Sequence, residues 1–320
     1  MSGPKSFGQM AVPAVADVFR PSTLVEAVAF LAEHKGRAVP VAGGTDLMVD
    51  ARMGRADPEW LVDLTRLPSL AAFDFDGTVL RIGSMTRIRA LELDPRIRQR
   101  ASGLVDAARV LGSVQIRTMA TIGGNLCHGT PSAEMPPPLL VHDTECDIAG
   151  PAATRSVPLV DLFAGPNQTT LRSDEILLGL RLAAPLQHSG SCYLRQTVRW
   201  SMDLAGVGVA AFVEVDGLTV RNARVALGAV APVPLLLETV AEVLIGSDLT
   251  QEIADEAGRR AAAACSPISD ARGTAEYRRQ IVAVLVPRAL RIAWLRAVGQ
   301  WPDDLATPVN GIVPDGGEAE

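Results

Sequence analysis

The chain has 320 residues, enough for roughly two domains. Its 48% apolar and 21% charged residues are typical of a globular protein and exclude global disorder. A net charge of −6 and an aromatic content of 4% argue against a protein that binds nucleic acid, either through the phosphate backbone or by base stacking.

The targeting and cysteine patterns are those of an intracellular protein. The first twenty residues contain no apolar stretch of signal-peptide length, and no run of about 18 apolar residues occurs, so we expect a cytoplasmic protein without a membrane span. The cysteines form no C-x-x-C pair and show no ligand spacing to the histidines. We therefore predict scattered buried thiols, and no metal site or iron–sulfur cluster on this chain; the cysteines are Cys127, Cys146, Cys192 and Cys265.

The N-terminal segment predicts a small α/β unit. Apolar residues recur at helical spacing from the predicted N-cap Ser22 to Gly36. The run RAVPVA (37–42) predicts a buried strand that leads into a glycine pair, and residues 60–63 predict a second strand. This pattern indicates a mostly parallel unit over residues 13–67.

The middle of the chain predicts an α+β arrangement over residues 70–187. Asp76-Gly77 lies between two β-rich runs and indicates a tight hairpin. Residues 116–129 form a Gly-rich stretch to which no helix or strand is assigned. The expected helices are 86–93 and 98–112, and the expected strands are 144–150, 154–160 and 175–182.

A polar segment at 185–191 is the best candidate for a domain boundary. After it the sequence predicts a second domain over 190–298, in which Pro287 should kink or divide the last helix. Residues 300–320 predict a flexible acidic tail. The expected strands are 192–198, 207–215 and 219–227, the last two joined at Asp216-Gly217, and the expected helices are 235–245, 249–264 and 274–298.

Two glycine pairs carry the main functional signal, in VAGGTDL (41–47) and TIGGNL (121–126). Each follows an apolar stretch and precedes a small polar side chain. Paired glycines let backbone amides turn inward as donors for phosphate oxygens. The alternative, a pair of unrelated tight turns, stays open at this point. Neither loop has the Lys of a P-loop, so an ATPase of that type is disfavoured.

The segment Gly206–Ala211 (GVGVAA) matches a dinucleotide motif in its letters only. That motif lies between a strand and a helix, whereas this segment runs on as AAFVEV toward a hairpin turn. We predict a strand with small residues there, and no Rossmann nicotinamide site.

With both loops, the chain resembles a known family, the medium, FAD-binding subunits of molybdenum hydroxylases, which include those of carbon monoxide dehydrogenase and xanthine dehydrogenase. The resemblance covers about residues 13–298. Its motifs, in the family's order, are VAGGTDLMVDAR, IRTMATIGGNLCHGTPSAEMPPPLL, DEILLGLRL, RWSMDLAGVGVAA, VALGAVAPVPL and SDARGTAEYRR.

The resemblance implies an α+β fold. Residues 13–187 would be an FAD-binding domain of the vanillyl-alcohol-oxidase (PCMH) type, with subdomains at about 13–67 and 70–187 that hold FAD between them. Residues 190–298 would be a C-terminal domain of three antiparallel strands plus helices, in agreement with the pattern above.

The resemblance also implies the cofactor contacts. The two glycine loops would contact the pyrophosphate from either side, Leu177 would pack on the isoalloxazine ring, and His128 is a candidate contact to phosphate or ribose. Glu134 stands where the family usually has Asp near the ribose or ribityl group, and Arg195 stands where Lys is commoner near the flavin. The predicted contacts are Val41, Ala42, Gly43, Gly44, Thr45, Asp46, Leu47, Thr121, Ile122, Gly123, Gly124, Asn125, His128, Glu134, Leu177 and Arg195.

The sequence favours electron transfer over substrate oxidation by this chain. No nucleophile elbow, metal-binding HExxH or covalent-flavin signature is present, His142 is predicted to be structural, and no catalytic residue is assigned. The resemblance implies partners: a small subunit with two [2Fe-2S] clusters and a large subunit with molybdopterin cytosine dinucleotide, in a dimer of heterotrimers. Electrons would pass from the clusters through FAD to a quinone, dioxygen or NAD. The alternatives are a stand-alone flavin oxidoreductase of the same superfamily and a non-enzymatic nucleotide-binding or scaffold subunit.

Overall fold

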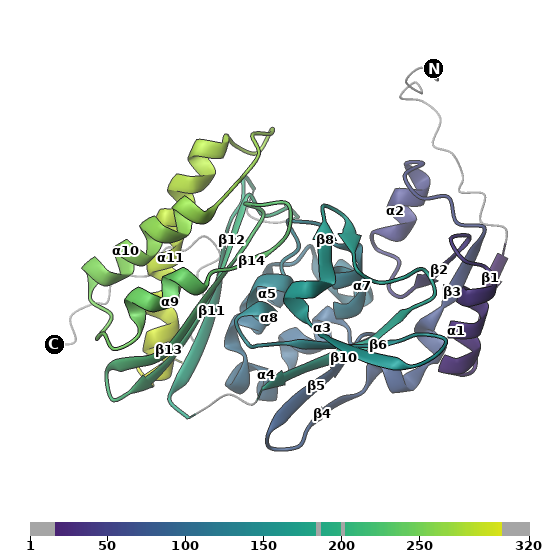
Figure 1. Ribbon diagram of the computed structural model, residues 1–320, viewed down its shortest axis with the longest axis horizontal. Coiled ribbons are helices and arrows are strands. Elements are labelled where there is room, and N and C mark those ends of the chain that lie inside the picture. The colour runs from purple at the N-terminus through teal and green to yellow at the C-terminus, as the bar shows by residue number, and fades with distance from the viewer. Residues whose placement is uncertain (1–16, 184–186, 200–201, 303–320) are drawn as a thin grey trace.

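The computed structural model describes residues 17–183, 187–199 and 202–302, which form three units side by side (Figure 1). The N-terminal unit (residues 17–63, purple) lies beside a central unit (73–183), and the C-terminal unit (189–297, green to yellow) packs on the other side of the central unit. No helix within the described residues is long and apolar enough to cross a membrane.

Three sequence expectations fall partly on residues that are not described. They concern the start of the first unit at residue 13, the boundary segment 185–191 and the tail 300–320. Residues 1–16, 184–186, 200–201 and 303–320 lie outside the described part of the chain.

The N-terminal unit is a three-stranded parallel sheet in the order β1-β3-β2; the sequence predicts its parallel character and the strands β2 and β3, but not β1. The first helix begins one residue later than expected. Thr23, and not Ser22, is its N-cap, because the Thr23 side chain accepts a hydrogen bond from the Glu26 amide (3.2 Å), while the Ser22 amide donates to the Glu26 carboxylate (2.8 Å). The elements are β1 (Asp17–Phe19), α1 (Leu24–Glu33), β2 (Ala38–Val41), α2 (Leu47–Arg52) and β3 (Trp60–Asp63).

The central unit is a five-stranded antiparallel sheet in the order β4-β5-β10-β6-β7. The predicted hairpin at Asp76-Gly77 is confirmed: Gly77 has φ +93°, and Asp76 Oδ1 accepts from the amides of Thr78 and Val79. Two 3-10 helices, η1 (Leu64–Arg66) and η2 (Pro68–Ala71), lead into the sheet from the N-terminal unit. Its strands are β4 (Phe73–Phe75), β5 (Val79–Gly83), β6 (Glu145–Ala149), β7 (Thr154–Pro158) and β10 (Ile176–Ala183).

Short helices cover one face of this sheet, and here the sequence predictions were partly wrong. The single helix expected at 98–112 is two helices, separated at Ala101, whose φ of −144° and ψ of 60° are not helical. The Gly-rich stretch at 116–129, to which no helix was assigned from the sequence, is mostly helical. The elements are α3 (Ile88–Leu93), α4 (Pro95–Arg100), α5 (Ser102–Val110), α6 (Val114–Met119), α7 (Ile122–His128) and α8 (Pro136–Leu140), followed along the chain by η3 (Leu159–Leu162), β8 (Phe163–Gly165) and β9 (Gln168–Thr169).

The C-terminal unit is a four-stranded antiparallel sheet in the order β11-β12-β13-β14, with three helices on its outer face (Figure 1). The three predicted strands are confirmed, and the two-residue β14 adds to them. The GVGVAA segment lies at the start of a strand, as expected. The elements are β11 (Ser189–Gln196), β12 (Val207–Asp216), β13 (Thr219–Gly228), β14 (Leu235–Leu236), α9 (Glu238–Leu244), α10 (Gln251–Ala264) and α11 (Ala275–Ala297).

Both faces of this sheet are buried, which explains its nearly continuous apolar strands. Val209 and Val225 pack with Leu290 of α11 in one core. On the other face, Ala210 and Phe212 join the core of the central unit. The C-terminal unit is therefore fixed to the central unit by a shared apolar core.

Pro287 does not divide the last helix: α11 continues through it without a break. A proline removes the amide that would bond the carbonyl four residues earlier, here that of Ala283. Gly258 of α10 packs against this carbonyl so closely that a Cβ on Gly258 would lie 2.5 Å from it. The absence of a side chain at Gly258 lets α10 cover the interrupted turn.

Buried polar groups also join the central and C-terminal units. Arg296 donates to Asp106 at 2.7 Å and to the Ser191 carbonyl, and the Tyr193 amide donates to the same carboxylate at 3.2 Å. His142 lies 3.2 Å from the Ser191 hydroxyl, with its ring edge-on to Phe212. The interpretation of His142 as structural is confirmed by these contacts.

His142 should make stability depend on pH. Burial, followed by the charge of Arg224, lowers its pKa to about 4 from an ordinary value of 6.5. Below about pH 6.5 the unfolded chain takes up a proton that the folded chain accepts only near pH 4, so stability should fall over this range by about 3 kcal/mol. Urea unfolding of wild type and His142→Gln at several pH values checks this.

The His142→Gln variant should lose less stability than wild type between pH 6.5 and 4. His188→Asn is the matched control, since His188 is exposed and asparagine tolerates its φ of +61°. An equal loss of stability in wild type and His142→Gln would contradict the assignment.

Candidate functional site

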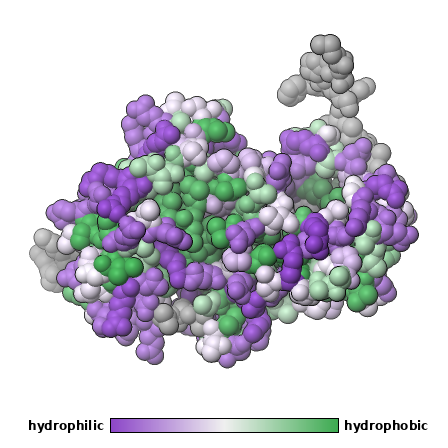
Figure 2. All heavy atoms as spheres, viewed as in Figure 1, coloured by the Kyte–Doolittle hydropathy of each residue, from purple (hydrophilic) through white to green (hydrophobic). Residues whose placement is uncertain are grey.

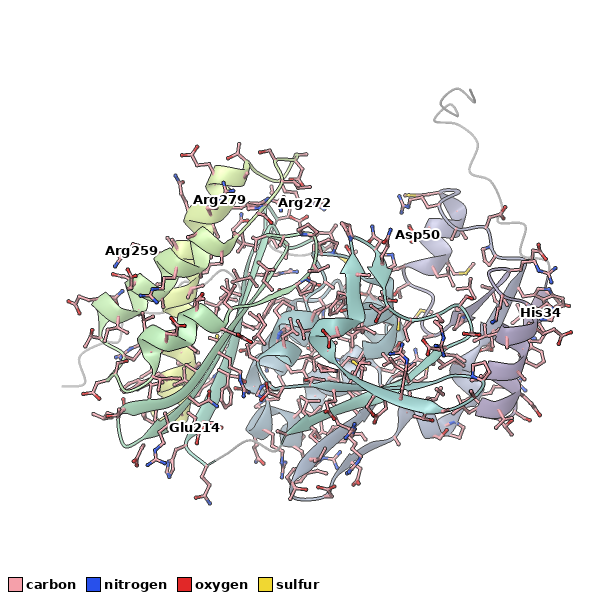
Figure 3. The ribbon with its side chains drawn as sticks, in the orientation of Figure 1. His34, Asp50, Glu214, Arg259, Arg272 and Arg279 are labelled. Atoms are coloured by element: carbon pink, nitrogen blue, oxygen red, sulfur yellow. The ribbon has the colours of Figure 1, made fainter. Side chains whose placement is uncertain are left out.

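A cavity of about 730 Å³ lies between the N-terminal and central units. The C-terminal unit closes one part of it, through Arg272 and through four residues between β11 and β12, namely Arg199, Met202, Asp203 and Leu204. Figure 2 shows apolar side chains gathered in the middle of one face of the molecule, with hydrophilic residues around them. In Figure 3, Asp50 on α2 and Arg272 on the loop before α11 lie along the same edge of the molecule. The volume of this cavity is that of a pocket for a large organic ligand.

The first glycine loop leaves β2 and forms one wall of the cavity. Gly43 lies against the backbone at the end of α6, which leads into the second loop, since a Cβ at Gly43 would be 2.2 Å from the Met119 carbonyl oxygen. Gly44 has φ +68°, which favours glycine. Within the described residues, no acceptor faces the amides of Gly43, Gly44 and Thr45. The first loop thus offers free backbone donors.

The second glycine loop is the first turn of α7, and its amides are already bonded within the chain. Gly123 donates to the Ser84 carbonyl at 2.8 Å, Gly124 donates to the Thr121 hydroxyl at 3.1 Å, and the Asn125 amide donates to the Thr121 carbonyl at 3.1 Å. The prediction that both glycine pairs present free amides is wrong for this loop, because Thr121 acts as an N-cap. The Thr121 hydroxyl accepts here and keeps its proton available for another partner.

Several buried polar atoms at the cavity have no partner within the described residues. They are Asn125 Oδ1, His128 Nδ1 and Ser84 Oγ. Buried polar groups are normally hydrogen-bonded, and leaving one unpaired costs about 1–3 kcal/mol. Their position around one cavity fits a polar ligand that supplies the missing partners.

His128 is oriented by Asp50. Its Nε2 lies 3.1 Å from Asp50 Oδ2, and Arg55 contacts the same carboxylate at 2.6 Å. Burial raises the pKa of Asp50, but hydrogen bonds to Arg55 and His128 outweigh it and hold the pKa below its usual value. An ionised Asp50 fixes the ring so that Nδ1 is the nitrogen left for another partner.

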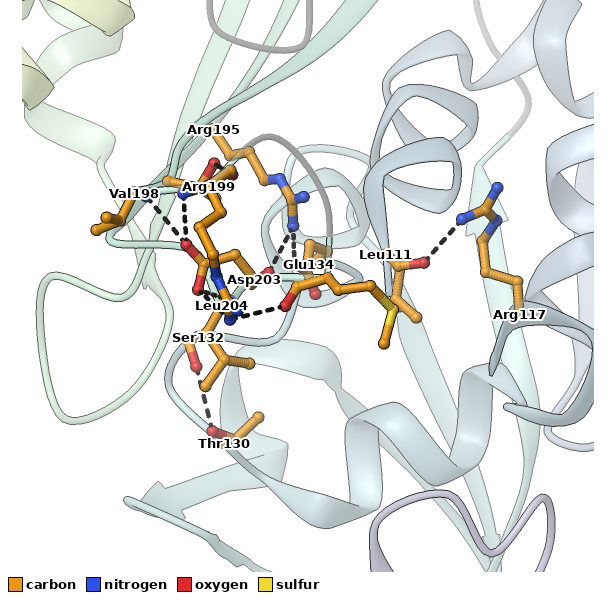
Figure 4. A network of polar contacts seen from close by, with 12 residues as sticks. Leu111, Arg117, Thr130, Ser132, Glu134, Arg195, Val198, Arg199, Asp203 and Leu204 are labelled. Carbon is orange, nitrogen blue, oxygen red and sulfur yellow. Dashed lines mark hydrogen bonds and ion pairs between the residues drawn. The ribbon is translucent and has the colours of Figure 1, made fainter. Parts of the chain in front are cut away.

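Glu134 is a buried carboxylate on the cavity wall (Figure 4). Arg195 Nη1 donates to Glu134 Oε1 at 2.6 Å and to the Asp203 carbonyl at 3.2 Å. Burial raises the pKa of Glu134 to about 7, although the charge and hydrogen bond of Arg195 act in the opposite direction. Asp46, on the first loop, also raises it, which places a second carboxylate within electrostatic range.

The structure brings most of the predicted contacts together at this cavity. Two of them do not line it: Ile122 is fully buried in the central core, and Arg195 lies behind Glu134. Arg195 extends from β11 to the Glu134 carboxylate and donates to it, so that Glu134, and not Arg195, lines the cavity. The predicted residues that line the cavity are Val41, Ala42, Gly43, Gly44, Thr45, Asp46, Leu47, Thr121, Gly123, Gly124, Asn125, His128, Glu134 and Leu177.

Sequence reasoning missed one wall of the cavity. Arg199, Met202 and Leu204, between β11 and β12, line it together with Asp203. Asp203 shapes this segment, because its carboxylate accepts from the amides of Val198 and Arg199. The available signal was the motif RWSMDLAGVGVAA, which contains all four of these residues.

The prediction of buried thiols holds for three cysteines and is wrong for the fourth. Cys127 is exposed and lines the cavity, since α7 turns this face toward the first loop, whereas the other three are buried.

Comparison with known proteins identifies relatives over nearly the whole chain. Residues 11–185 match the family described as "FAD binding domain in molybdopterin dehydrogenase", and residues 192–293 match "CO dehydrogenase flavoprotein C-terminal domain". The carbon monoxide dehydrogenase medium chain of Hydrogenophaga pseudoflava is 33% identical, over 89% of this chain and 99% of the relative. The putative xanthine dehydrogenase FAD-binding subunit of Escherichia coli K12 is 29% identical, over 89% and 98%.

Solved structures agree with these matches. A carbon monoxide dehydrogenase from Hydrogenophaga pseudoflava superposes with a TM-score of 0.86 and 32% identity, covering 89% of this chain and 99% of the other. Quinoline 2-oxidoreductase from Pseudomonas putida 86 superposes with a TM-score of 0.84 and 26% identity, covering 90% and 100%.

Proposed function

Since the chain belongs to the family of FAD-binding medium chains of molybdopterin dehydrogenases, we propose that it is the FAD-carrying electron-transfer subunit of a heterotrimeric molybdenum hydroxylase. It is an oxidoreductase subunit with an α+β fold. The observation that carries the proposal is the cavity between the two glycine loops, where free amides and unpartnered polar atoms meet.

The residues at the cavity fit the diphosphate, the ribityl chain and the isoalloxazine ring of FAD. The free amides of the first loop suit the diphosphate, since backbone donors without a nearby Cβ can approach phosphate oxygens closely. Asn125 Oδ1 and His128 Nδ1, which have no hydrogen-bond partner among the described residues, can make further polar contacts to the cofactor. The carboxylates of Asp46 and Glu134 accept hydroxyl hydrogen bonds, as a ribityl chain offers, and Leu177 provides an apolar surface for the ring.

Bound FAD would accept electrons singly from iron–sulfur clusters and deliver them in pairs to a terminal acceptor, a quinone, dioxygen or NAD. The task of this chain is to bind and orient the cofactor, and to hold the charges around it. We propose that the partners are a small subunit with two [2Fe-2S] clusters and a large subunit with molybdopterin cytosine dinucleotide. Two such heterotrimers would associate in the cytoplasm.

We further propose an FAD-binding domain over residues 13–187 and a C-terminal domain over 190–298. The support is that the C-terminal sheet and its helices enclose a core of their own. The FAD-binding domain would comprise subdomains at about 13–67 and 70–187, with the cavity between them.

Purification of the native complex tests the function. We expect one FAD per chain, co-purification with iron and molybdenum, and flavin reduction by the substrate of the complex only when the partners are present. A chain that purifies alone, with a flavin that a small molecule reduces directly, would instead be a stand-alone flavin oxidoreductase. A colourless complex would contradict the proposal.

An ion pair beside the cavity, between the N-terminal and central units, should slow FAD release. Lys35, next to the cavity residue Gly36, lies 2.9 Å from Asp174 of the central unit, and the hydrogen bond of Lys35 is the main reason that the pKa of Asp174 is lowered. Because Lys35 is largely exposed, we expect Lys35→Ala to speed FAD release by at most about fivefold. Flavin fluorescence after dilution measures the rate.

The matched control is Arg37→Ala, which breaks the ion pair to Glu59 inside the N-terminal unit. This variant should release FAD at the wild-type rate. Equal acceleration in both variants would show that the Lys35–Asp174 contact has no special role.

A further inference from the structure

Glu134 and Arg195 form a buried ion pair, and only Glu134 lines the cavity. Glu134 is 5% exposed and lines the cavity, whereas Arg195 is 1% exposed and lies behind it. One nitrogen of Arg195 holds both Glu134 Oε1 and the Asp203 carbonyl, and its Nε is buried without a partner in the described part of the chain. Arg195 therefore acts on the cavity only through Glu134.

The charged and titratable groups around this pair come from three segments. Tyr193, two residues before Arg195 on β11, has a buried hydroxyl with no partner among the described residues, and burial, then Glu134, raises its pKa. Asp46 acts on Glu134 from the first glycine loop. Asp203, whose carbonyl accepts from Arg195, carries an ionised carboxylate that Arg199 pairs at 3.6 Å.

This arrangement leaves the charge of Glu134 finely balanced. Burial favours its neutral form and Arg195 its ionised form, and together they bring its pKa to about 7. A further negative charge in the cavity would tip the balance toward the neutral acid. Reduction of a flavin by two electrons and one proton adds such a charge.

We propose that Glu134 takes up a proton when the flavin in this cavity is reduced, and that Arg195 is the positioning residue that keeps Glu134 ionised while the flavin is oxidised. The inference rests on the proposed function. Two electrons, from the iron–sulfur partner or from dithionite in the experiment, and one proton from solvent go to the flavin. A second proton from solvent converts the Glu134 carboxylate to a carboxylic acid.

The direct test is an infrared difference spectrum of the FAD-loaded protein, reduced with dithionite at about pH 8, where Glu134 starts ionised. Wild type should gain a carboxylic-acid C=O band on reduction, which shifts in heavy water. Glu134→Gln should lose this band. Glu175→Gln is the matched control, because Glu175 also lines the cavity and is buried, but hydrogen bonds to Arg155 hold its pKa low; it should keep the band.

The positioning role of Arg195 is tested by measuring the carboxylic-acid band as a function of pH. Without its guanidinium, Glu134 should already be protonated in the oxidised protein near pH 8. Arg195→Gln should therefore lack the band there and recover it only at higher pH, whereas Arg195→Lys should retain it near pH 8. A band in Arg195→Gln at the same pH values as in wild type would contradict this role.

If a variant fails to fold, the spectrum of wild type still tests whether a carboxylic acid forms when the flavin is reduced. Absence of a carboxylic-acid band in reduced wild type, or its persistence in Glu134→Gln, would overturn the inference while FAD binding leaves the proposed function intact. Failure of the wild-type chain to bind FAD would overturn the proposed function itself.

Discussion

Gly43→Val should bind FAD at least about 100-fold more weakly than wild type. A Cβ at this position would lie 2.2 Å from the carbonyl oxygen and 2.7 Å from the carbonyl carbon of Met119. These are backbone atoms at the end of α6, so the overlap can be relieved only by moving the first loop away from α6 and the second loop that follows it. Such overpacking costs about 3 kcal/mol, which corresponds to the stated loss of affinity. Fluorescence titration with FAD measures it.

Two further variants separate the contact between the loops from general damage. Gly165→Ala adds a methyl group whose nearest neighbour is 3.6 Å away, so it should bind FAD as wild type does. Gly124→Leu leaves Gly43 unchanged, but its Cβ would lie 3.1 Å from the Thr121 hydroxyl and 4.0 Å from the Ala42 Cβ of the first loop, so the larger side chain at this cavity-lining position should weaken binding. Wild-type affinity in Gly43→Val and Gly124→Leu would contradict the loop assignment.

Asp106→Ala should be the most destabilising single change, lowering the free energy of unfolding by about 3–5 kcal/mol. Its carboxylate accepts from Arg296 at 2.7 Å and from the Tyr193 amide at 3.2 Å, and both Asp106 and Arg296 are largely buried. Removing the carboxylate leaves the Arg296 charge buried beside the interface between the central and C-terminal units. Urea unfolding followed by circular dichroism measures the loss.

The control is Glu256→Ala, which breaks the exposed ion pairs of Glu256 with Arg259 and Arg260 on α10, where Arg259 points away from the sheet (Figure 3). Exposed ion pairs contribute little to the free energy of unfolding, so this variant should have nearly the wild-type value. A loss in Asp106→Ala no larger than in this control would show that the interface depends on its apolar core alone.

Local signals in the sequence predicted much of the fold. Asp76-Gly77 and Asp216-Gly217 both form hairpins, because a tight turn needs a residue with positive φ, and Gly77 and Gly217 supply it. The continuous apolar run of β12 predicted a buried strand. These features depend on a few neighbouring residues, so the sequence contains them directly.

Features that depend on distant contacts were not predictable. Whether the amides of Gly123 and Gly124 are free depends on Ser84 and on the cap formed by Thr121. Arg195 meets Glu134 across 61 positions of sequence. The segment that includes Asp203 reaches the cavity only because the C-terminal sheet packs on the central unit.

The central claim is that the first glycine loop, closed by the second, holds the diphosphate of FAD. A crystal structure of the chain with FAD tests it most directly. We expect diphosphate oxygens within hydrogen-bond distance of the Gly43, Gly44 or Thr45 amides, with Asn125 and His128 Nδ1 newly partnered. FAD that is well ordered elsewhere on the chain, with these amides still unpaired, would contradict the account.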